Sequence, residues 1–504
     1  MEHESNKTIA STTPFEEEDF SNIEEDHPVG FSLAWTVICT ALVSIGMGLL
    51  VWSYDSLTSI EHVENPERAL AHIVTRSMDL ESLHAQAPTW EQSLHQVLNS
   101  EEDPSTQLIG WYDELINTSS DPLSSLYAAV LEAEAGEVEG MNLRIESWDE
   151  QPEPFPLFQR MLTTAYGEQP SSAEDMMMLQ ARLAEGVPDN WFYRQLSLQL
   201  SKRADDVSLE NRTHAAIETR VNLLFLQNRV LMLTEIGLAV LSVLGLLLVM
   251  WIRHQKGSGV FMMSHAVLPP PWFGRDGFAV LMRGGAITLL LLSGLGVLLG
   301  AYFSVIDGAM DSKIIELMSS LLLYAPIPIL LYYYLLRPKG YSLSEVLGLY
   351  VRAGKVGMLV LTVLALFACG MFGDVVISLG GKALGTSTHW TEWFNDSLVW
   401  GGSSGIIILF LEVVVLAPIF EECIFRGIVF GSLRRRFGWV VSAVVSAAIF
   451  SIVHGYGLVG FVAVWWSGFL WAWAYEKTGS LWPGILAHAL NNLVLLLSLL
   501  LVFR

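Results

Sequence analysis

The sequence contains little charge and little cysteine. Of its 504 residues, 16% are charged and three are cysteine, whereas 52% are hydrophobic and the mean hydropathy is +0.43. Soluble domains carry about 25% charged residues, so this composition excludes an ordinary soluble protein and indicates an integral protein of the lipid bilayer. Cys39, Cys369 and Cys423 all lie in apolar runs, which excludes a disulfide framework in the polar part of the chain.

Basic residues are scarcer than acidic ones. The chain has 28 Lys and Arg against 52 Asp and Glu, and its formal net charge is -24. The acidic residues lie mostly in the first half, outside the long apolar runs. Nucleic-acid binding depends on clustered Lys and Arg, and the sequence has no basic block of that kind. We therefore expect no nucleic-acid partner.

Three segments of different character make up the first part of the chain. Residues 1–30 are rich in Glu, Asp, Ser and Thr, a composition typical of a disordered acidic tail. Residues 31–52 form an apolar run without the basic start and small-residue cleavage site of a secretory signal, so we expect a retained transmembrane anchor. Residues 53–229 contain helix-period segments separated by Pro, Gly, Asp and Ser, which predicts a soluble helical domain.

The rest of the chain is dominated by apolar runs. We divide it into transmembrane helices with linkers over 230–399 and a transmembrane core over 400–504, which gives about nine spans with the first anchor. The fold class is therefore all-α, a polytopic membrane protein with a soluble helical domain inserted between its first and second spans. The predicted runs after the domain lie near 231–252, 280–303, 315–336, 356–379, 405–430, 439–454, 459–475 and 481–503.

Lys and Arg in the short loops predict the orientation. They occur in alternate loops, which we expect to be cytoplasmic, so residues 1–30 lie inside and the domain 53–229 lies outside. The absence of disulfides and sorting signals favours a bacterial cytoplasmic (inner) membrane. The basic residues of these loops are Arg253, Lys256, Arg275, Arg283, Arg337, Lys339, Arg352, Lys355, Arg434, Arg435 and Arg436.

The segment "IFEECIFRG", residues 419–427, places three charged residues inside an apolar run. A charge at the centre of a bilayer costs roughly 2.5–3.5 kcal/mol on insertion scales. Glu422 and Arg426 are four residues apart, so they lie on one helix face and can form an ion pair. Glu421 points about 100° away and needs another partner. One interpretation is purely structural, a buried ion pair beside a protonated glutamate.

Two other spans carry polar residues. His454 ends an apolar helix with Phe450 one turn earlier, and His488 and Asn492 are four residues apart on the last span. Such residues at membrane depth normally face one another or a wet cavity. Straight spans would place Glu421 and His488 in the cytoplasmic half of the bilayer and His454 nearer the other face, so a tilted helix or a later helix start is needed to bring them level.

Two kinds of chemistry fit this set. Glu421 could act as general base on a water molecule with the help of His454, while His488 and Asn492 face the oxyanion of a tetrahedral intermediate. Alternatively, Glu421, Glu422, His454 and His488 could bind a divalent metal such as zinc that activates the water. The sequence has no H-E-x-x-H motif and no cysteine ligand set, so a metal fits these residues but is not required by them.

In their order along consecutive spans, Glu421-Glu422-x-x-x-Arg426, Phe450-x-x-x-His454 and His488-x-x-x-Asn492 resemble the CAAX protease and bacteriocin-processing family of intramembrane endopeptidases, also called the Abi family. The resemblance covers about residues 400 to 500. It implies that Glu421 and His454 activate water, that His488 and Asn492 stabilise the oxyanion, and that Glu422, Arg426 and Phe450 support the site. Whether the family chemistry uses a metal or a glutamate alone is an open question, and the domain 53–229 departs from the family core.

The resemblance also implies the substrate class. Prenyl-protein members of the family cleave the C-terminal tripeptide after a lipidated cysteine, and other members act in bacteriocin maturation or self-immunity, or as regulators. We therefore expect an intramembrane protease for a membrane-bound or lipidated protein or peptide. Two alternatives stay open: a non-catalytic scaffold or immunity protein, and a proton-coupled transporter, which the further intramembrane acids Asp374 and Glu412 would suit.

Overall fold

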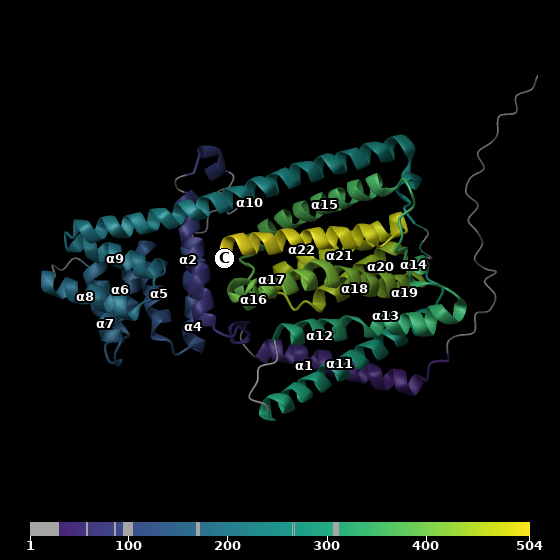
Figure 1. Ribbon diagram of the computed structural model, residues 1–504, viewed down its shortest axis with the longest axis horizontal. Coiled ribbons are helices and arrows are strands. Elements are labelled where there is room, and N and C mark those ends of the chain that lie inside the picture. Colours follow the sequence, from purple (N-terminus) through teal and green to yellow (C-terminus); the bar gives the residue numbers. More distant parts are fainter. Residues whose placement is uncertain are drawn as a thin grey trace, which may run out of the picture.

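The computed structural model describes residues 30–56, 59–84, 87–93, 104–167, 172–264, 266, 268–305 and 312–504. The predicted acidic tail, apart from Gly30, lies outside the described residues. In the described part every regular element is a helix, which confirms the all-α fold. The helices form two groups, a set of short helices at one end and a bundle of long apolar helices beside it (Figure 1).

The short helices pack around a hydrophobic core that also includes residues of the apolar bundle, such as Trp390 and Leu496. Most of them begin where the sequence supplies a cap or a proline: Asp121 accepts a hydrogen bond from the Leu123 amide at the start of α5, and Asn190 accepts one from the Tyr193 amide at the start of α9. Tyr127 of α5 stacks on Phe192 of α9 with ring centroids 4.0 Å apart. The helices are α2 (Pro66–His84), α4 (Pro104–Thr118), α5 (Pro122–Glu134), α6 (Val138–Glu146), α7 (Phe155–Tyr166), α8 (Ala173–Gly186) and α9 (Trp191–Arg203).

The apolar helices match the predicted spans. Among the described residues, seven helices are long and apolar enough to cross a membrane, and two shorter apolar helices occupy Leu33–Leu49 and Trp439–Ile452. The chain is therefore a multi-pass membrane protein. The bundle contains α1 (Leu33–Ser56), α10 (Val207–Lys256), α11 (Gly274–Val305), α12 (Ser312–Tyr324), α13 (Pro326–Leu330), α15 (Val356–Ala383), α17 (Ser403–Phe410), α18 (Ala417–Glu421), α19 (Gly431–Arg434), α20 (Trp439–Ile452), α21 (Leu458–Thr478) and α22 (Trp482–Phe503).

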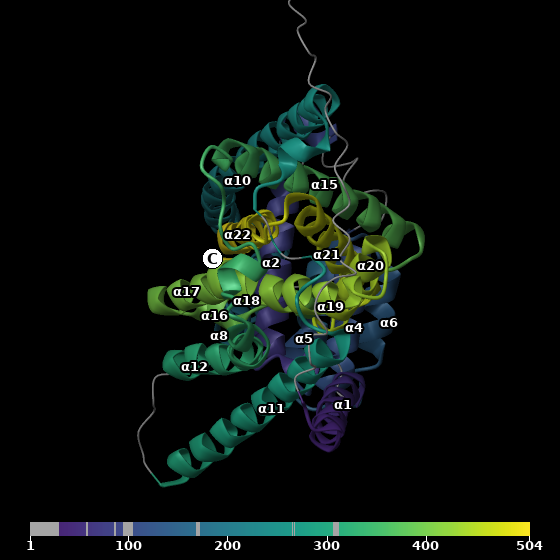
Figure 2. The ribbon, with the colours of Figure 1, turned by 90° about the vertical axis from the view of Figure 1, so that its right-hand side faces the viewer.

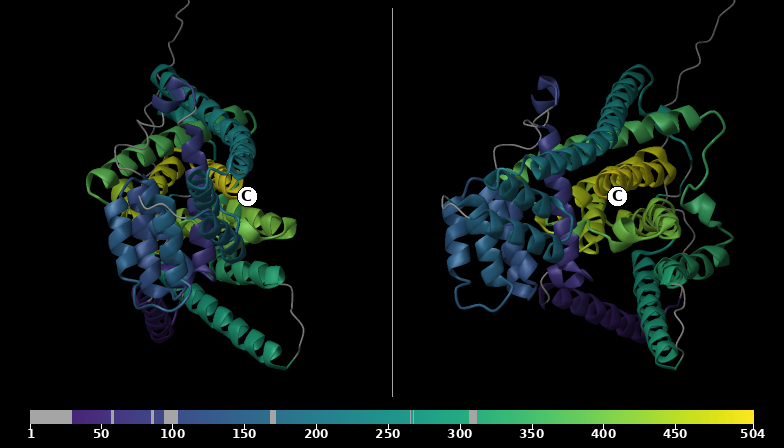
Figure 3. Two further views of the ribbon diagram at one scale, coloured as in Figure 1. Left: turned by 90° about the vertical axis from the view of Figure 1, so that its left-hand side faces the viewer. Right: turned by 60° about the vertical axis from the view of Figure 1, so that its left-hand side comes forward.

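Helix α10 joins the two groups without a break (Figures 1 and 3). Asp206 caps its start by accepting hydrogen bonds from the amides of Ser208 and Leu209, and Gly257, with φ 75°, ends it. Its 50 residues make a rod about 75 Å long at 1.5 Å per residue. The boundary that composition suggests after residue 229 therefore falls inside one continuous helix.

Three π-helical segments interrupt the bundle: η4 (Leu331–Leu336), η7 (Leu411–Leu416) and η8 (Glu422–Phe430). Such turns are rare and frequently mark functional sites. Segments α17, η7, α18, η8 and α19 together form the span Ser403–Arg434. Seen from the end away from the short helices, α18, α19, α21 and α22 lie near the middle of the bundle, with α1 and α11 to one side (Figure 2).

The basic loops meet at one end of the bundle. Lys339 Nζ donates to the Pro271 carbonyl and Arg435 Nη1 donates to the Pro270 carbonyl, each at 2.7 Å. The short helices α5–α9 lie at the opposite end (Figure 1). This is the arrangement that the loop charges predict, although which face is cytoplasmic stays a prediction.

Candidate active site

The ion pair predicted within residues 419–427 is present, and both of its partners lie on η8. Arg426 Nη1 lies 2.9 Å from Glu422 Oε1, and both side chains are fully buried. The guanidinium carbon also sits 4.3 Å from the ring centroid of Phe450 and 5.0 Å from that of Trp471. Aromatic faces attract a cation most strongly where water is excluded, so the two rings and the carboxylate together hold the arginine inside the bundle.

Two glycines leave room for this pair. A Cβ atom at Gly468 of α21 would lie 2.7 Å from Arg426 Nη2, and one at Gly484 of α22 would lie 2.9 Å from Glu422 Oε2. Larger residues at either position would displace the buried charges. The close approach of α21 and α22 to the motif therefore depends on glycine at these two places.

Glu421 points away from the ion pair, as its position on the helix predicts. Its Oε1 accepts a hydrogen bond of 3.0 Å from the Tyr324 hydroxyl, and its Oε2 lies 3.8 Å from His488 Nε2. The Tyr324 ring stacks on Phe420, with centroids 5.6 Å apart and planes inclined by 6°. Tyr324 is a site residue that sequence reasoning missed, because a tyrosine at the end of an apolar helix is also the ordinary residue of a membrane interface.

His488 lies between the two glutamates. Its Nδ1 is 3.3 Å from Glu422 Oε1, and its ring stacks on Trp471 with centroids 4.2 Å apart. A carboxylate accepts hydrogen bonds, so Nδ1 carries a proton and Nε2 faces Glu421. The histidine predicted as an oxyanion donor therefore directs both ring nitrogens toward carboxylates.

His454 reaches the same region from α20. Its Nδ1 lies 2.7 Å from the Phe450 carbonyl oxygen, and because a carbonyl only accepts, Nδ1 carries the proton and Nε2 of the neutral ring is free to accept one. The Phe450 ring contacts both histidines, with centroids 4.6 Å from His454 and 5.9 Å from His488. His454 follows the end of α20 (Trp439–Ile452) and lines the same cavity as Glu421 and His488, although straight spans would have placed it nearer the other face.

Asn492 connects the last helix to a π-helical segment. Its Nδ2 donates a hydrogen bond of 2.9 Å to the carbonyl oxygen of Val413 in η7. An asparagine amide has two N–H groups, so one remains for a ligand. The predicted oxyanion donor is thus held in place by its other hydrogen.

These side chains line one cavity of about 770 Å³. The four predicted catalytic residues all contribute to its wall, whereas Glu422 and Arg426 are not among its lining residues. Both polar and apolar side chains contribute to the wall. Its residues include Tyr324, Asp374, Thr388, Glu392, Trp393, Phe394, Asn395, Leu398, Leu409, Val413, Ala417, Glu421, Phe450, His454, Ser467, Trp471, His488, Asn491, Asn492, Leu495, Leu496 and Leu499.

The same residues were considered as metal ligands. Over the described ranges, no group of three or more His, Cys, Asp or Glu side chains is placed to hold a metal ion. Glu422 Oε1 already contacts Arg426 and His488, so the four candidate donors are not assembled around one point. The metal alternative stays a prediction.

The other intramembrane acids have partners of their own. Glu412 Oε1 accepts a hydrogen bond of 2.7 Å from Ser320, and Glu235, which sequence reasoning did not single out, accepts one of 2.8 Å from Ser498. Asp374 lines the cavity. Glu412 therefore stands apart from the four predicted catalytic residues.

Comparisons with known proteins fit this site. Residues 403–494 match the family described as type II CAAX prenyl endopeptidase Rce1-like, a segment that contains the ion pair, both histidines and Asn492. The chain is 29% identical over 129 residues to "Putative membrane peptidase YdiL" of Bacillus subtilis (strain 168), a match that covers 26% of this chain and 50% of that relative. No solved structure matches. These matches confirm the resemblance found in the sequence: residues 403–494 are similar to CAAX-type endopeptidases of the membrane.

Proposed function

We propose that this protein is an intramembrane endopeptidase that hydrolyses a peptide bond of a membrane-bound or lipidated protein or peptide. The observation that carries the proposal is the placement of Glu421. Its neighbour Glu422 forms an ion pair with Arg426, whereas Glu421 lies in the wall of the cavity beside His488. A carboxylate held at a cavity without a cationic partner of its own is suited to general base catalysis.

The geometry supports a glutamate-based mechanism. Glu421 accepts a proton from a water molecule, whose oxygen attacks the peptide carbonyl, and the same proton passes to the leaving amine. Tyr324 occupies Oε1, so the water is oriented by Oε2 and by the free Nε2 of His454. The remaining N–H of Asn492 is available to the oxyanion.

The location belongs to the same proposal. We infer a bacterial cytoplasmic (inner) membrane, with the basic loops inside and the short helices outside, because positively charged loops are retained in the cytoplasm. The contacts of Lys339 and Arg435 with residues of one linker support this orientation by placing separate basic loops on the same side. A bound divalent metal such as zinc stays an alternative source of the activated water.

Glu421→Gln tests the function directly. We expect it to leave folding and topology intact and to lower cleavage by roughly 10²–10⁴-fold, the usual contribution of a general base. Membrane proteomes of cells with either form are compared for peptides with new termini. Glu412→Gln is the matched control, because Glu412 is also an intramembrane glutamate that accepts a hydrogen bond from a hydroxyl group, and it should leave the fragments unchanged. If Glu421→Gln produced the same fragments as the wild type, the hydrolytic assignment would be wrong.

A further inference from the structure

The cavity extends from Glu421 toward one end of the bundle only. Its lining includes Thr388 and the segment 392–395, which connect α15 to α16 (Asp396–Trp400). None of its described lining residues belongs to the basic loops 253–275, 337–355 or 434–438. The lining of the cavity therefore reaches the end of the bundle that contacts the short helices α2 and α4–α9, here called the soluble domain, and this end is here called the opening of the cavity.

Helix α4 of the soluble domain contacts the segment at this opening. Gln107 Nε2 donates a hydrogen bond of 3.0 Å to Ser387 Oγ, and His389 Nε2 lies 3.2 Å from Glu114 Oε2. Trp390, next along the segment, is fully buried and belongs to the same hydrophobic core as residues of the soluble domain. One edge of the opening is therefore fixed by the soluble domain.

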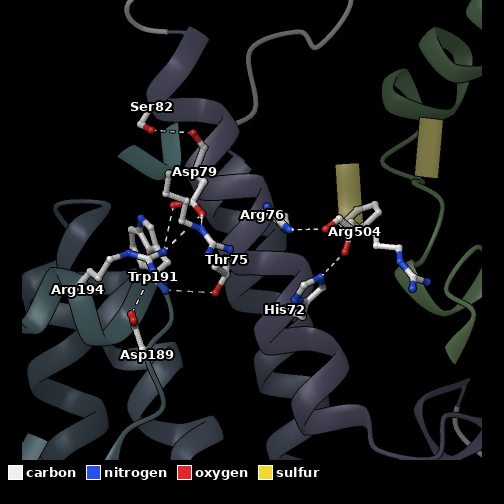
Figure 4. A network of polar contacts seen from close by, with 11 residues as sticks. His72, Thr75, Arg76, Asp79, Ser82, Asp189, Trp191, Arg194 and Arg504 are labelled. Carbon is white, nitrogen blue, oxygen red and sulfur yellow. Dashed lines mark hydrogen bonds and ion pairs between the residues drawn. The ribbon is translucent and has the colours of Figure 1, made fainter. Parts of the chain in front are cut away.

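Helix α2 contacts a second element beside this opening, the end of α22. His72 Nε2 lies 2.7 Å from the carbonyl oxygen of Phe503, and Arg76 Nη2 donates to the backbone oxygen of Arg504 at 3.3 Å, as Figure 4 shows. Phe503 in turn stacks on Trp393 of the first edge, with centroids 5.0 Å apart. The two edges are thus joined to each other and to the soluble domain.

The inner wall indicates what enters. Beside polar residues such as Asn395 and Asn491, the lining contains five leucine side chains, those of Leu398, Leu409, Leu495, Leu496 and Leu499. Apolar side chains bury favourably against such a wall. A polypeptide with an apolar segment fits this passage better than a polar peptide does.

Resting on the proposed function, we propose that the substrate is a membrane-anchored polypeptide whose apolar segment enters from the soluble-domain side, through an opening whose rim α2 and α4 hold in place. Cleavage then occurs in the half of the membrane that faces the soluble domain. A substrate presented from the side of the basic loops has no corresponding passage among the described lining residues.

Cysteine labelling tests the direction of access without needing catalysis. A membrane-impermeant maleimide is applied to one membrane face at a time, with Ser467→Cys inside the cavity and Asn395→Cys at its opening, and the wild type gives the background of the three native cysteines. Glu139→Cys on the soluble domain and Arg436→Cys in a basic loop, both exposed, identify the faces. We expect both cavity positions to be labelled only from the Glu139 face; labelling only from the Arg436 face, or from neither, overturns the proposal.

The rim is tested by loosening it. Gln107→Ala combined with Glu114→Ala removes two contacts of α4 with the segment and should speed labelling of Ser467→Cys about two- to tenfold, the effect of one lost hydrogen bond or slightly more. Glu139→Ala on the same domain is the control and should not change the rate. An unchanged rate in the double variant overturns the role of α4 at the rim.

The direction of substrate access and the peptidase activity are tested independently of each other. Repeating the labelling with Glu421→Gln should give the same pattern, because access needs no chemistry. If Glu421→Gln leaves cleavage unchanged, the peptidase assignment fails, but the labelling result on the direction of access still holds. If cleavage is found, new termini should map to the part of each substrate on the Glu139 face, and termini confined to the opposite face overturn the substrate class.

Discussion

The molecule contains two buried arginine–carboxylate clusters, one in the soluble domain and one in the membrane core. They combine the same types of charged group in different arrangements. In the soluble domain, Asp79 of α2 contacts two arginines, Arg194 of α9 at 3.4 Å and Arg220 of α10. Arg220 is 32% exposed, so water completes its solvation. In the core, Arg426 and Glu422 are both fully buried.

The difference shows what each cluster does. In the soluble domain one carboxylate, that of Asp79, contacts arginines of two other helices and so holds three helices together. In the core, Arg426 lies near two adjacent glutamates but forms an ion pair with Glu422. The carboxylate of Glu421 instead faces the cavity beside His488. Neutralising one of two adjacent acids is what separates a supporting residue from a reacting one.

The comparison predicts its largest effect for Arg426→Ala. Removing the guanidinium leaves Glu422 charged and fully buried, which costs roughly 3–5 kcal/mol. The yield of folded protein after detergent extraction should fall sharply, as measured by size-exclusion chromatography. Arg436→Ala, in an exposed loop position, provides the control. A normal yield for Arg426→Ala would contradict the assignment of this pair as a structural support.

A smaller effect is expected for Asp79→Asn in the other cluster. The change leaves Arg194 with Asp189, which lies 3.3 Å away, and Arg220 with water, so we expect a loss of roughly 1–3 kcal/mol. Hydrogen exchange of α2 and α9 in the full-length protein should increase while that of α21 and α22 stays the same. Equal effects on both groups of helices would show that the two clusters stabilise one cooperative unit.

Tyr324→Phe should have a moderate effect on catalysis alone. It removes the hydrogen bond to Glu421 but keeps the ring that stacks on Phe420. The expected loss is about 0.5–1.5 kcal/mol, or roughly two- to twelvefold in cleavage rate, with an unchanged melting temperature. Tyr333→Phe, on an exposed tyrosine of the neighbouring segment, is the matched control. A loss of stability without a change in rate would make Tyr324 a packing residue.

The smallest effect concerns pH and the soluble domain. Burial lowers the pKa of His72 below its ordinary value of 6.5, and the nearby Arg76, Arg220 and Arg68 act in the same direction, whereas its bond to Phe503 opposes them. Because the unfolded state then binds the proton more readily, stability is full above pH 6.5 and falls as the pH drops toward the folded pKa.

This pH effect can be isolated by substitution. The melting temperature of the wild type should fall more between pH 8 and pH 5 than that of His72→Gln. Glutamine keeps a hydrogen-bond donor but has no group that titrates in this range, whereas histidine has an ordinary pKa of about 6.5. His214→Gln, on a half-exposed histidine, should behave as the wild type. Identical pH dependence in His72→Gln and the wild type would remove His72 as the titrating group.

The fold could be predicted from the sequence largely because length and hydropathy decide it. Apolar runs of about twenty residues must be helices in lipid, and the predicted runs coincide with apolar helices. The continuity of α10 could not be predicted. The change from polar to apolar composition near residue 229 looks like a domain boundary, although the helix continues through it. Nothing in the polar half of α10 interrupts the helix, since it contains no proline.

The site was predictable where one helix determines it. The spacing of Glu422 and Arg426 fixes their contact, and the same spacing turns Glu421 away. Contacts between helices were not predictable. Tyr324 lies 97 residues before Glu421, and the position of His488 between two glutamates depends on the packing of α22 against η8, which no local pattern records.

The uninterrupted helix α10 has a mechanical consequence. One end of this rod packs on α2 and α9 of the soluble domain, and the other packs on α15 and α22 in the bundle, where Glu235 accepts a hydrogen bond from Ser498. A helix without proline resists sharp bending. A protein that bound the soluble domain and tilted it would therefore also tilt the transmembrane part of α10. This movement would displace α22, the helix that carries His488 and Asn492.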